Sequence, residues 1–249
     1  MKIERFTRLK NGQYKLNLDD NSNILLHEDL ILKYELLIHK EINNQKIEQL
    51  LEENKSYIAY DLAINYLKVK MRSRKEIKDY LLKKDISEEL INNAIEKLEE
   101  QGYLNDLSYA KAFINDRINL SNDGPYKIKE QLIKLGISEE IVLKELEVFD
   151  NDLEQERIKK LIDKQIKINH NKGEFLLKKK LLDYLVNLGY SKGVVISLVD
   201  DVSICDEDIK KKEYEKIYKK LSSKYSGKEL EYKLKQKMYQ KGFSNFELD

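Results

Sequence analysis

The sequence is poor in the residues that interrupt helices or cross-link folds. Its 249 residues include one Pro, nine Gly and one Cys, and they include no Trp. So few Pro and Gly favour long helices over a strand-rich fold, because these two residues punctuate most turns. The single cysteine, Cys205, cannot form an intrachain disulfide and suits a reducing compartment. We therefore expect a mainly helical, cytoplasmic protein.

Other absences exclude classes of function. No run of about 18 apolar residues is available to span a membrane, and the start MKIERFTRLK lacks the apolar core of a signal peptide. Three His and one Cys supply too few ligands for a zinc site. The motifs GxxxxGKS/T, GxGxxG, HExxH and GxSxG are missing. The Asp-rich stretch 200–208 lacks the order of a calcium loop and is interpreted as a polar linker. We expect no metal, no cofactor and no catalysis.

Charge is balanced overall but not along the chain. The net charge is +1, yet residues 1–152 sum to −5 and residues 153–249 sum to +6. Residues 209–241 alone carry 12 Lys against four Glu, a balance of +8. Such a segment attracts polyanions or acidic protein surfaces. Lysines scattered over solvated helix faces would produce the same count, so the pattern leaves both interpretations open.

A short pattern recurs along the chain as KKDIS, KLGIS, NLGYS and QKGFS. Its turn residue falls at Asp85, Gly136, Gly189 and Gly242, at intervals of 51, 53 and 53 residues. Four occurrences at nearly one period indicate a repeat architecture.

Each repeat is predicted to contain three helices. Apolar residues four and eight positions before the turn residue share one helix face, which predicts a packed helix there. Ser87 and Ser138 follow two of the turns as N-caps, each with two Glu in the next helical turn. A further apolar-striped helix precedes each of these pairs. Ser73 with Glu76 matches a capping box, and Pro125 suits the first position of a helix.

Residues 1–55 depart from the repeat. Asn11-Gly12 lies between two partly alternating stretches, which predicts a β-hairpin, and a third short strand follows near residue 24. We therefore expect a mostly α fold in which about four tandem three-helix units form an elongated, curved array behind a small N-terminal β-hairpin or meander. The predicted parts are 1–55 with the strands and further helices, repeats at 56–104, 105–152 and 153–204, and a partial, basic repeat at 205–249.

Basic residues crowd the turn and helix in KMRSRKEIKDYLLKK, residues 70–84. Arg72, Arg74, Lys75 and Lys78 lie at or near a helix N-terminus, whose amide groups also favour anions. Such a site suits phosphates or acidic side chains, although ion pairs with Glu76 and its neighbours explain the pattern equally well. Lys127 and Lys129 occupy the related face one unit later.

Three tyrosines flank the helix starts of the second unit. We interpret Tyr103, Tyr109 and Tyr126 as core or half-buried residues rather than as a platform for stacking bases.

The stretch YLKVKMRSRKEIKDYLLKKDIS, followed by LEEQGYLNDLSYAKAF and GPYKIKEQLIKLGIS, resembles the RecX regulatory family, which modulates the bacterial RecA recombinase. The resemblance is strongest over residues 59–149, and beyond residue 150 it consists mainly of periodicity. Asp85 stands where the family usually has Gly. Asp tolerates a left-handed turn better than most other residues.

The resemblance implies a non-enzymatic regulator that lodges in the groove of a RecA–DNA filament. Independently of the resemblance, we expect an elongated monomer. The resemblance also implies effects on ATPase activity, strand exchange and filament stability, and hence on DNA recombination, repair and the SOS response. Two alternatives remain: a protein that binds single- or double-stranded DNA directly without RecA, and a helical scaffold for another acidic protein. The residues expected to contact filament or DNA are Arg72, Arg74, Lys75, Lys78, Arg117, Lys127 and Lys129, although Arg117 also lies at the edge of an apolar stripe.

Overall fold

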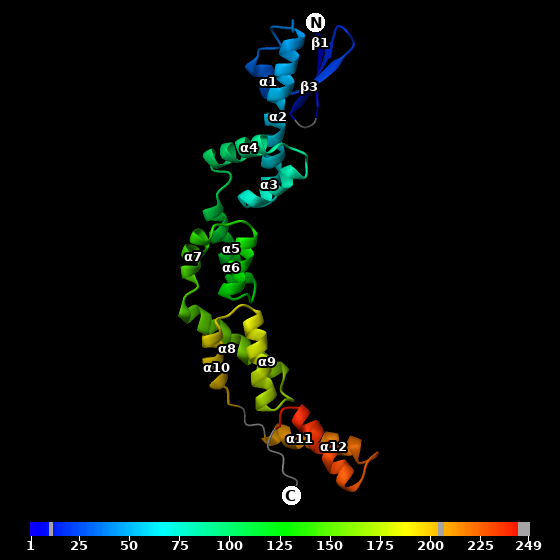
Figure 1. Cartoon of the computed structure of the whole chain (residues 1–249), viewed down its shortest axis with the longest axis vertical. Helices are drawn as coiled ribbons and strands as arrows, with labels where there is room; N and C mark the ends of the chain where they lie inside the picture. The colour runs from blue at the N-terminus through cyan, green and yellow to red at the C-terminus, as the bar shows by residue number, and fades with distance from the viewer. Residues whose placement is uncertain (10–11, 204–206, 244–249) are drawn as a thin grey trace. The chain divides into compact units, whose positions relative to one another are not determined.

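The computed structural model describes residues 1–9, 12–203 and 207–243. The chain divides into two compact units (Figure 1). The first comprises Met1–Ala110 with Leu135–Ile137, and the second comprises Lys111–Lys134 with Ser138–Asp249. Each unit has its own buried residues and is described separately.

The first unit begins with a three-stranded antiparallel meander, as the sequence predicted. Strands β1 (Ile3–Arg8), β2 (Gln13–Leu18) and β3 (Asn23–His27) pair in the order β1-β2-β3. Asn11 of the predicted hairpin turn lies outside the described residues, and Gly12 has the positive φ of +69° that such a turn requires. Apolar side chains from the sheet pack with those of the short helix α1 (Glu28–Lys33) and the start of α2 (Asn44–Leu67).

Helix α2 belongs to both the meander and the first repeat. Asn54 anchors it to the sheet, because the buried Asn54 side chain accepts from the His27 amide at 2.8 Å and donates to the Leu25 carbonyl at 3.1 Å. Further along, the small residues Ala59 and Ala63 are fully buried in the core of the first repeat. The predicted boundary between residues 55 and 56 thus falls inside an unbroken helix.

The first repeat is completed by α3 (Arg74–Leu82) and α4 (Glu88–Glu100). The capping box is present: the Ser73 hydroxyl accepts from the Glu76 amide, and the Glu76 carboxylate accepts from the Ser73 amide. Ile77 and Leu81 form the predicted buried stripe. These local signals start and orient α3, and the apolar stripe fixes it against α2 and α4.

Helix α5 (Asp106–Leu120) starts in the first unit and continues in the second. The second repeat adds α6 (Pro125–Lys134), α7 (Glu139–Glu145) and the 3-10 turn η1 (Leu146–Val148). The third contains α8 (Asn151–Ile168), α9 (Glu174–Asn187) and α10 (Lys192–Asp200), and α11 (Glu207–Leu221) and α12 (Gly227–Gln240) follow. Cys205 and residues 244–249 lie outside the described residues.

The architecture is therefore mostly α, with tandem three-helix repeats behind a small β meander, as predicted. Within the described ranges, every helix is too short or too polar to cross a lipid bilayer.

Candidate functional site

Successive repeats contact each other through their second helices. The turn that follows the second helix of one repeat meets the start of the second helix of the repeat before it. In the second unit, the Leu188 carbonyl accepts from the Gly124 amide at 2.7 Å, and the Lys241 carbonyl accepts from the Gly173 amide at 2.9 Å. In the first unit, the Leu135 carbonyl accepts from the Ser73 hydroxyl at 2.7 Å. Groups that helix ends leave without an intrahelical partner are thus satisfied by the neighbouring repeat.

These junctions explain why the recurring turn residue is usually Gly. A Cβ atom at Gly189 would lie 2.5 Å from both Lys127 Cβ and its backbone nitrogen, and one at Gly136 would lie 2.6 Å from Lys75 Cβ. Both glycines also have φ of +86°, a region that side chains other than Gly disfavour. Asp85 has φ of +58° but is exposed at the first repeat, so it meets only the conformational requirement.

Arg72, a predicted contact residue, is held within the first repeat. Its guanidinium lies 3.9 Å from the Tyr66 ring centroid, its side chain is 13% exposed, and Nη1 contacts Glu76 Oε1 at 3.1 Å. Tyr66 in turn stacks on Tyr80 with ring centroids 4.1 Å apart. Burial alone would raise the pKa of Glu76, but hydrogen bonds from Ser73 and Arg72 outweigh burial and lower that pKa. Arg72 therefore stabilises the repeat from inside.

The N-terminus of α3, predicted as an anion site, already holds a carboxylate. The Arg74 amide donates to Asp106 Oδ1 at 2.9 Å, and Arg74 Nη1 donates to both Glu99 oxygens at 2.8 Å. Burial raises the pKa of Asp106, while the Arg74 amide opposes that rise. Arg74 itself is half exposed. Its guanidinium can therefore reach solvent, but its backbone amide is engaged.

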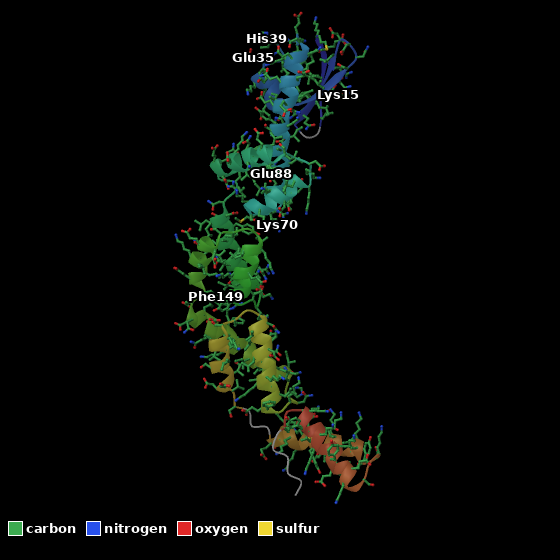
Figure 2. All side chains as sticks on the ribbon, viewed as in Figure 1. Lys15, Glu35, His39, Lys70, Glu88 and Phe149 are labelled. Carbon is green, nitrogen blue, oxygen red and sulfur yellow. The ribbon has the colours of Figure 1, made fainter. Side chains whose placement is uncertain are left out.

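Two of the predicted lysines occupy matching positions in successive repeats. Lys78 Nζ lies 3.2 Å from Glu88, and Lys129 Nζ lies 2.6 Å from Glu139. Each pair joins the second helix of its repeat to the first turn of the third helix. Figure 2 marks Glu88, together with Lys70 in the turn before α3. Lys75 is exposed, and the stem of its side chain lies at Gly136.

Arg117 and Lys127 gather around one buried carboxylate in the second unit. Lys127 Nζ lies 2.8 Å from Asp123 and Arg117 Nη1 lies 3.9 Å from it, while the Arg117 guanidinium also covers the Phe113 ring at 4.7 Å. Burial would raise the pKa of Asp123, but Lys127 and then Gln131 and Arg117 lower it below its ordinary value. Arg117 was also expected to lie at the edge of an apolar stripe, and its position over the Phe113 ring agrees with a structural role.

The predicted site residues thus form two groups, one around α3 in the first unit and one around the start of α6 in the second. Their exposed ion pairs are worth about 0–1 kcal/mol each. Arg74 and Lys78 can therefore exchange a carboxylate of their own repeat for another anion at small cost. Lys127 pairs with the buried Asp123, so losing that partner costs more. Breaking the largely covered contact of Arg72 costs more, because it removes the nearest cation from Glu76.

Sequence reasoning missed several residues that hold the repeats together. Arg157 donates to the Ser121 carbonyl at 2.7 Å and also to the Ile118 carbonyl, which joins α8 to the end of α5. The buried Glu154 accepts from the Ser191 amide at 2.7 Å. The recurring glycines were the available signal, because they mark places where another segment comes close to the backbone. They do not show which residues of the neighbouring repeat make the contact.

The tyrosine prediction was right for one residue and wrong for two. Tyr109 is buried, and burial followed by the neighbouring Glu76 raises its pKa to about 12. Tyr103 and Tyr126 are 61% and 63% exposed, because they lie on the outer side of a loop and of the first turn of α6.

Comparison with known proteins matches both central repeats. Residues 59–98 fit the family model described as the first three-helix domain of RecX, and residues 105–144 fit the second. The curated regulatory protein RecX of Oceanobacillus iheyensis is 30% identical over 172 residues, which are 66% of this chain and 63% of the relative. That of Streptococcus gordonii is 33% identical over 164 residues, 66% of this chain and 62% of the relative. The matched segment thus spans slightly under two thirds of these relatives.

Solved structures agree with the sequence comparison. A crystal structure of regulatory protein RecX aligns with a TM-score of 0.67 at 26% identity and covers 81% of this chain and 99% of its own. RecX from Lactobacillus salivarius aligns with a TM-score of 0.57 at 28% identity, covering 60% of this chain and 97% of its own.

Proposed function

Because this chain belongs to the RecX family of regulatory proteins, we propose that it is a non-enzymatic regulator of RecA. It binds the RecA–DNA filament in the cytoplasm and restrains ATP hydrolysis, strand exchange and filament stability. The observation that carries this proposal is the tandem match of residues 59–98 and 105–144 to the two RecX three-helix domains. Tandem repeats also form extended surfaces that suit extended partners.

The contact surface that we propose includes the exposed cations of the two matched repeats. Lys78 and Lys129 are the best placed, because they recur at one position in the two matched repeats and their ion-pair partners among the described residues are exposed carboxylates. Arg74, Lys75 and Lys127 lie close to them in sequence. A filament offers both phosphates and acidic side chains to such residues. Arg72 contributes indirectly by keeping α3 in place.

The experiment that tests this proposal is DNA-dependent ATP hydrolysis by the cognate RecA on single-stranded DNA, titrated with this chain. We expect inhibition by the native chain and at least tenfold weaker inhibition, about 1.4 kcal/mol, by the double variant Lys78→Glu, Lys129→Glu. The matched control is Lys111→Glu, Lys144→Glu, which changes two exposed lysines of the same region. Unchanged ATP hydrolysis with the native chain would contradict the function, and equal loss in both variants would contradict the site.

The alternative is direct binding of nucleic acid without RecA. It is favoured by the balance of +6 over residues 153–249. Such binding weakens steeply with salt, since each neutralised phosphate releases counterions. Titration of labelled single-stranded DNA at increasing salt, with RecA absent, tests this alternative. Tight binding that leaves RecA activity unaffected would favour it over the filament regulator.

A further inference from the structure

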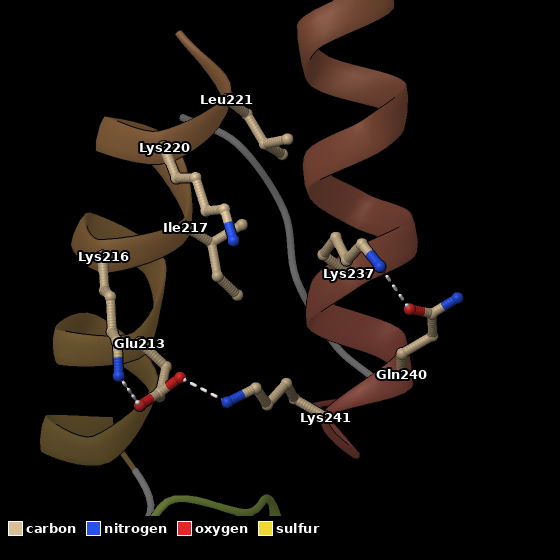
Figure 3. Close-up of a pocket in the computed structure, with 8 residues that line it drawn as sticks. All are labelled: Glu213, Lys216, Ile217, Lys220, Leu221, Lys237, Gln240 and Lys241. Carbon is tan, nitrogen blue, oxygen red and sulfur yellow. Dashed lines mark hydrogen bonds and ion pairs between the residues drawn. The ribbon is translucent and has the colours of Figure 1, made fainter. Parts of the chain in front are cut away.

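A pocket of about 470 Å³ opens between α11 and α12 (Figure 3). Ile217 and Leu221 supply its apolar part, and both project from α11 toward α12. The charged lining comes from both helices and the turn after α12: Glu213, Lys216, Lys220, Lys237 and Lys241, together with the amide of Gln240. The pocket therefore combines an apolar surface with four ammonium groups around it.

The single carboxylate in the lining neutralises only part of this charge. The Glu213 side chain is 10% exposed and contacts Lys241 at 2.7 Å and Lys216 at 4.0 Å (Figure 3). Lys237 donates to Gln240 at 3.1 Å, which is a neutral partner. Among the residues that the structure describes, neither Lys220 nor Lys237 has a carboxylate within salt-bridge distance. The lining thus keeps a surplus of positive charge.

Further lysines extend the surplus beyond the lining. Lys172, in the turn before α9, has its pKa lowered to about 8 by a contact with Lys180, then by burial and by the charges of Lys180 and Lys241. Neighbouring like charges repel one another, and binding of an anion reduces that repulsion. Part of the net charge of +8 carried by residues 209–241 is therefore gathered at one place in the structure. Four of its lysines line the same pocket: Lys216, Lys220, Lys237 and Lys241.

We propose that this pocket binds an acidic peptide segment of a partner protein, with one large apolar side chain of the segment against Ile217 and Leu221. The lysines would pair with carboxylates on either side of that anchor. This inference goes beyond the proposed function, since it concerns a different repeat and stands whether or not RecA is the partner. An apolar surface suits an anchored peptide. The bases of single-stranded nucleic acid commonly stack on aromatic side chains, and none of the described lining residues is aromatic.

The test is fluorescence anisotropy with the full chain and a short labelled peptide of Glu with Leu at regular intervals. The probe is measured at about 0.15 M salt, where remote charges are screened. The pocket variant is Lys216→Gln, Lys220→Gln, Lys237→Gln. The control variant is Lys211→Gln, Lys219→Gln, Lys228→Gln, which removes the same charge from exposed lysines of α11 and α12 outside the lining. A second probe replaces Leu by Ser and tests the apolar anchor without altering the protein.

We expect the pocket variant to weaken peptide binding at least tenfold and the control variant to change it less than about twofold, since screening limits the effect of remote charges. The Ser probe should bind several-fold more weakly than the Leu probe. Equal loss in both variants, or equal affinity of both probes, would overturn the proposal. Stronger binding of labelled oligothymidylate than of the peptide would assign the pocket to nucleic acid instead.

Discussion

Arg72 and Arg74 are two residues apart, yet their side chains have different surroundings. The Arg72 guanidinium is buried between Tyr66 and Glu76, whereas Arg74 is half exposed and pairs with Glu99 at the surface. Two cations that are close together in the sequence can therefore have different roles, one inside the repeat and one at its surface. Local charge alone cannot separate them, because the tyrosine that covers Arg72 comes from the preceding helix.

We predict that Arg72→Gln destabilises the fold by about 2–4 kcal/mol, because it removes the nearest cation from the largely covered Glu76 carboxylate and leaves Lys70, at 3.8 Å, as the next one. Arg74→Gln should cost about 1 kcal/mol or less, as expected for an exposed pair. Urea denaturation followed by circular dichroism measures both values. Equal losses in the two variants would contradict the assignment of Arg72 to the interior.

Lys172 provides a prediction with a definite dependence on pH. Its pKa in the fold is about 8, below the ordinary 10.5, so the folded state binds the proton less tightly than the unfolded chain does. The native chain should therefore gain stability as pH rises from about 8 to about 10.5. Lys172→Gln should raise stability at pH 7 by about 1 kcal/mol after allowance for solvent screening, and this difference should vanish above pH 10.5. Thermal denaturation across this range measures it, and a less stable variant at pH 7 would contradict the repulsion.

At the scale of the element, the turns at Gly136, Gly189 and Gly242 each end a helix and also contact the preceding repeat. The carbonyl groups of Leu135, Leu188 and Lys241 accept from Ser73, Gly124 and Gly173 respectively. The helices themselves were predictable, because apolar spacing, capping residues and the recurring turn are local signals. The docking was not, because its partners lie 62 to 68 residues apart and glycine spacing does not say which backbone approaches. Sequence distance also hid Glu99 and Asp106, which lie 25 and 32 residues from Arg74. Asp123 is only four residues from Lys127, so local helix spacing could have identified that pair.

Two glycine variants separate backbone conformation from close packing. Gly102 has φ of +73° with nothing within 4 Å of an added Cβ, whereas Gly189 has φ of +86° and a Cβ there would lie 2.5 Å from the Lys127 backbone nitrogen. Gly102→Ala should cost about 1–2 kcal/mol, the price of a left-handed Ala. Gly189→Ala should cost about 3 kcal/mol or more, because overpacking adds to that strain. Denaturant unfolding of the two variants decides the matter, and similar losses would contradict the junction.

At the scale of the whole molecule, the sequence predicted the fold class and the family, but it left the site as a hypothesis. Residues 59–98 and 105–144 carry the family match. The cations expected to reach a partner are mostly paired within their own repeats. Under the proposed function, the exposed pairs exchange their carboxylates for groups of the partner. Since such pairs are individually weak, several must exchange together to give useful affinity.

The most direct measurement is binding of the labelled chain to preformed RecA filaments on single-stranded DNA, compared with the same DNA without RecA, at about 0.15 M salt. We predict saturable binding to filaments that is at least tenfold tighter than binding to bare DNA and is weakened by Lys78→Glu, Lys129→Glu. Equal affinity for filament and bare DNA would contradict the filament regulator and leave direct nucleic-acid binding as the function.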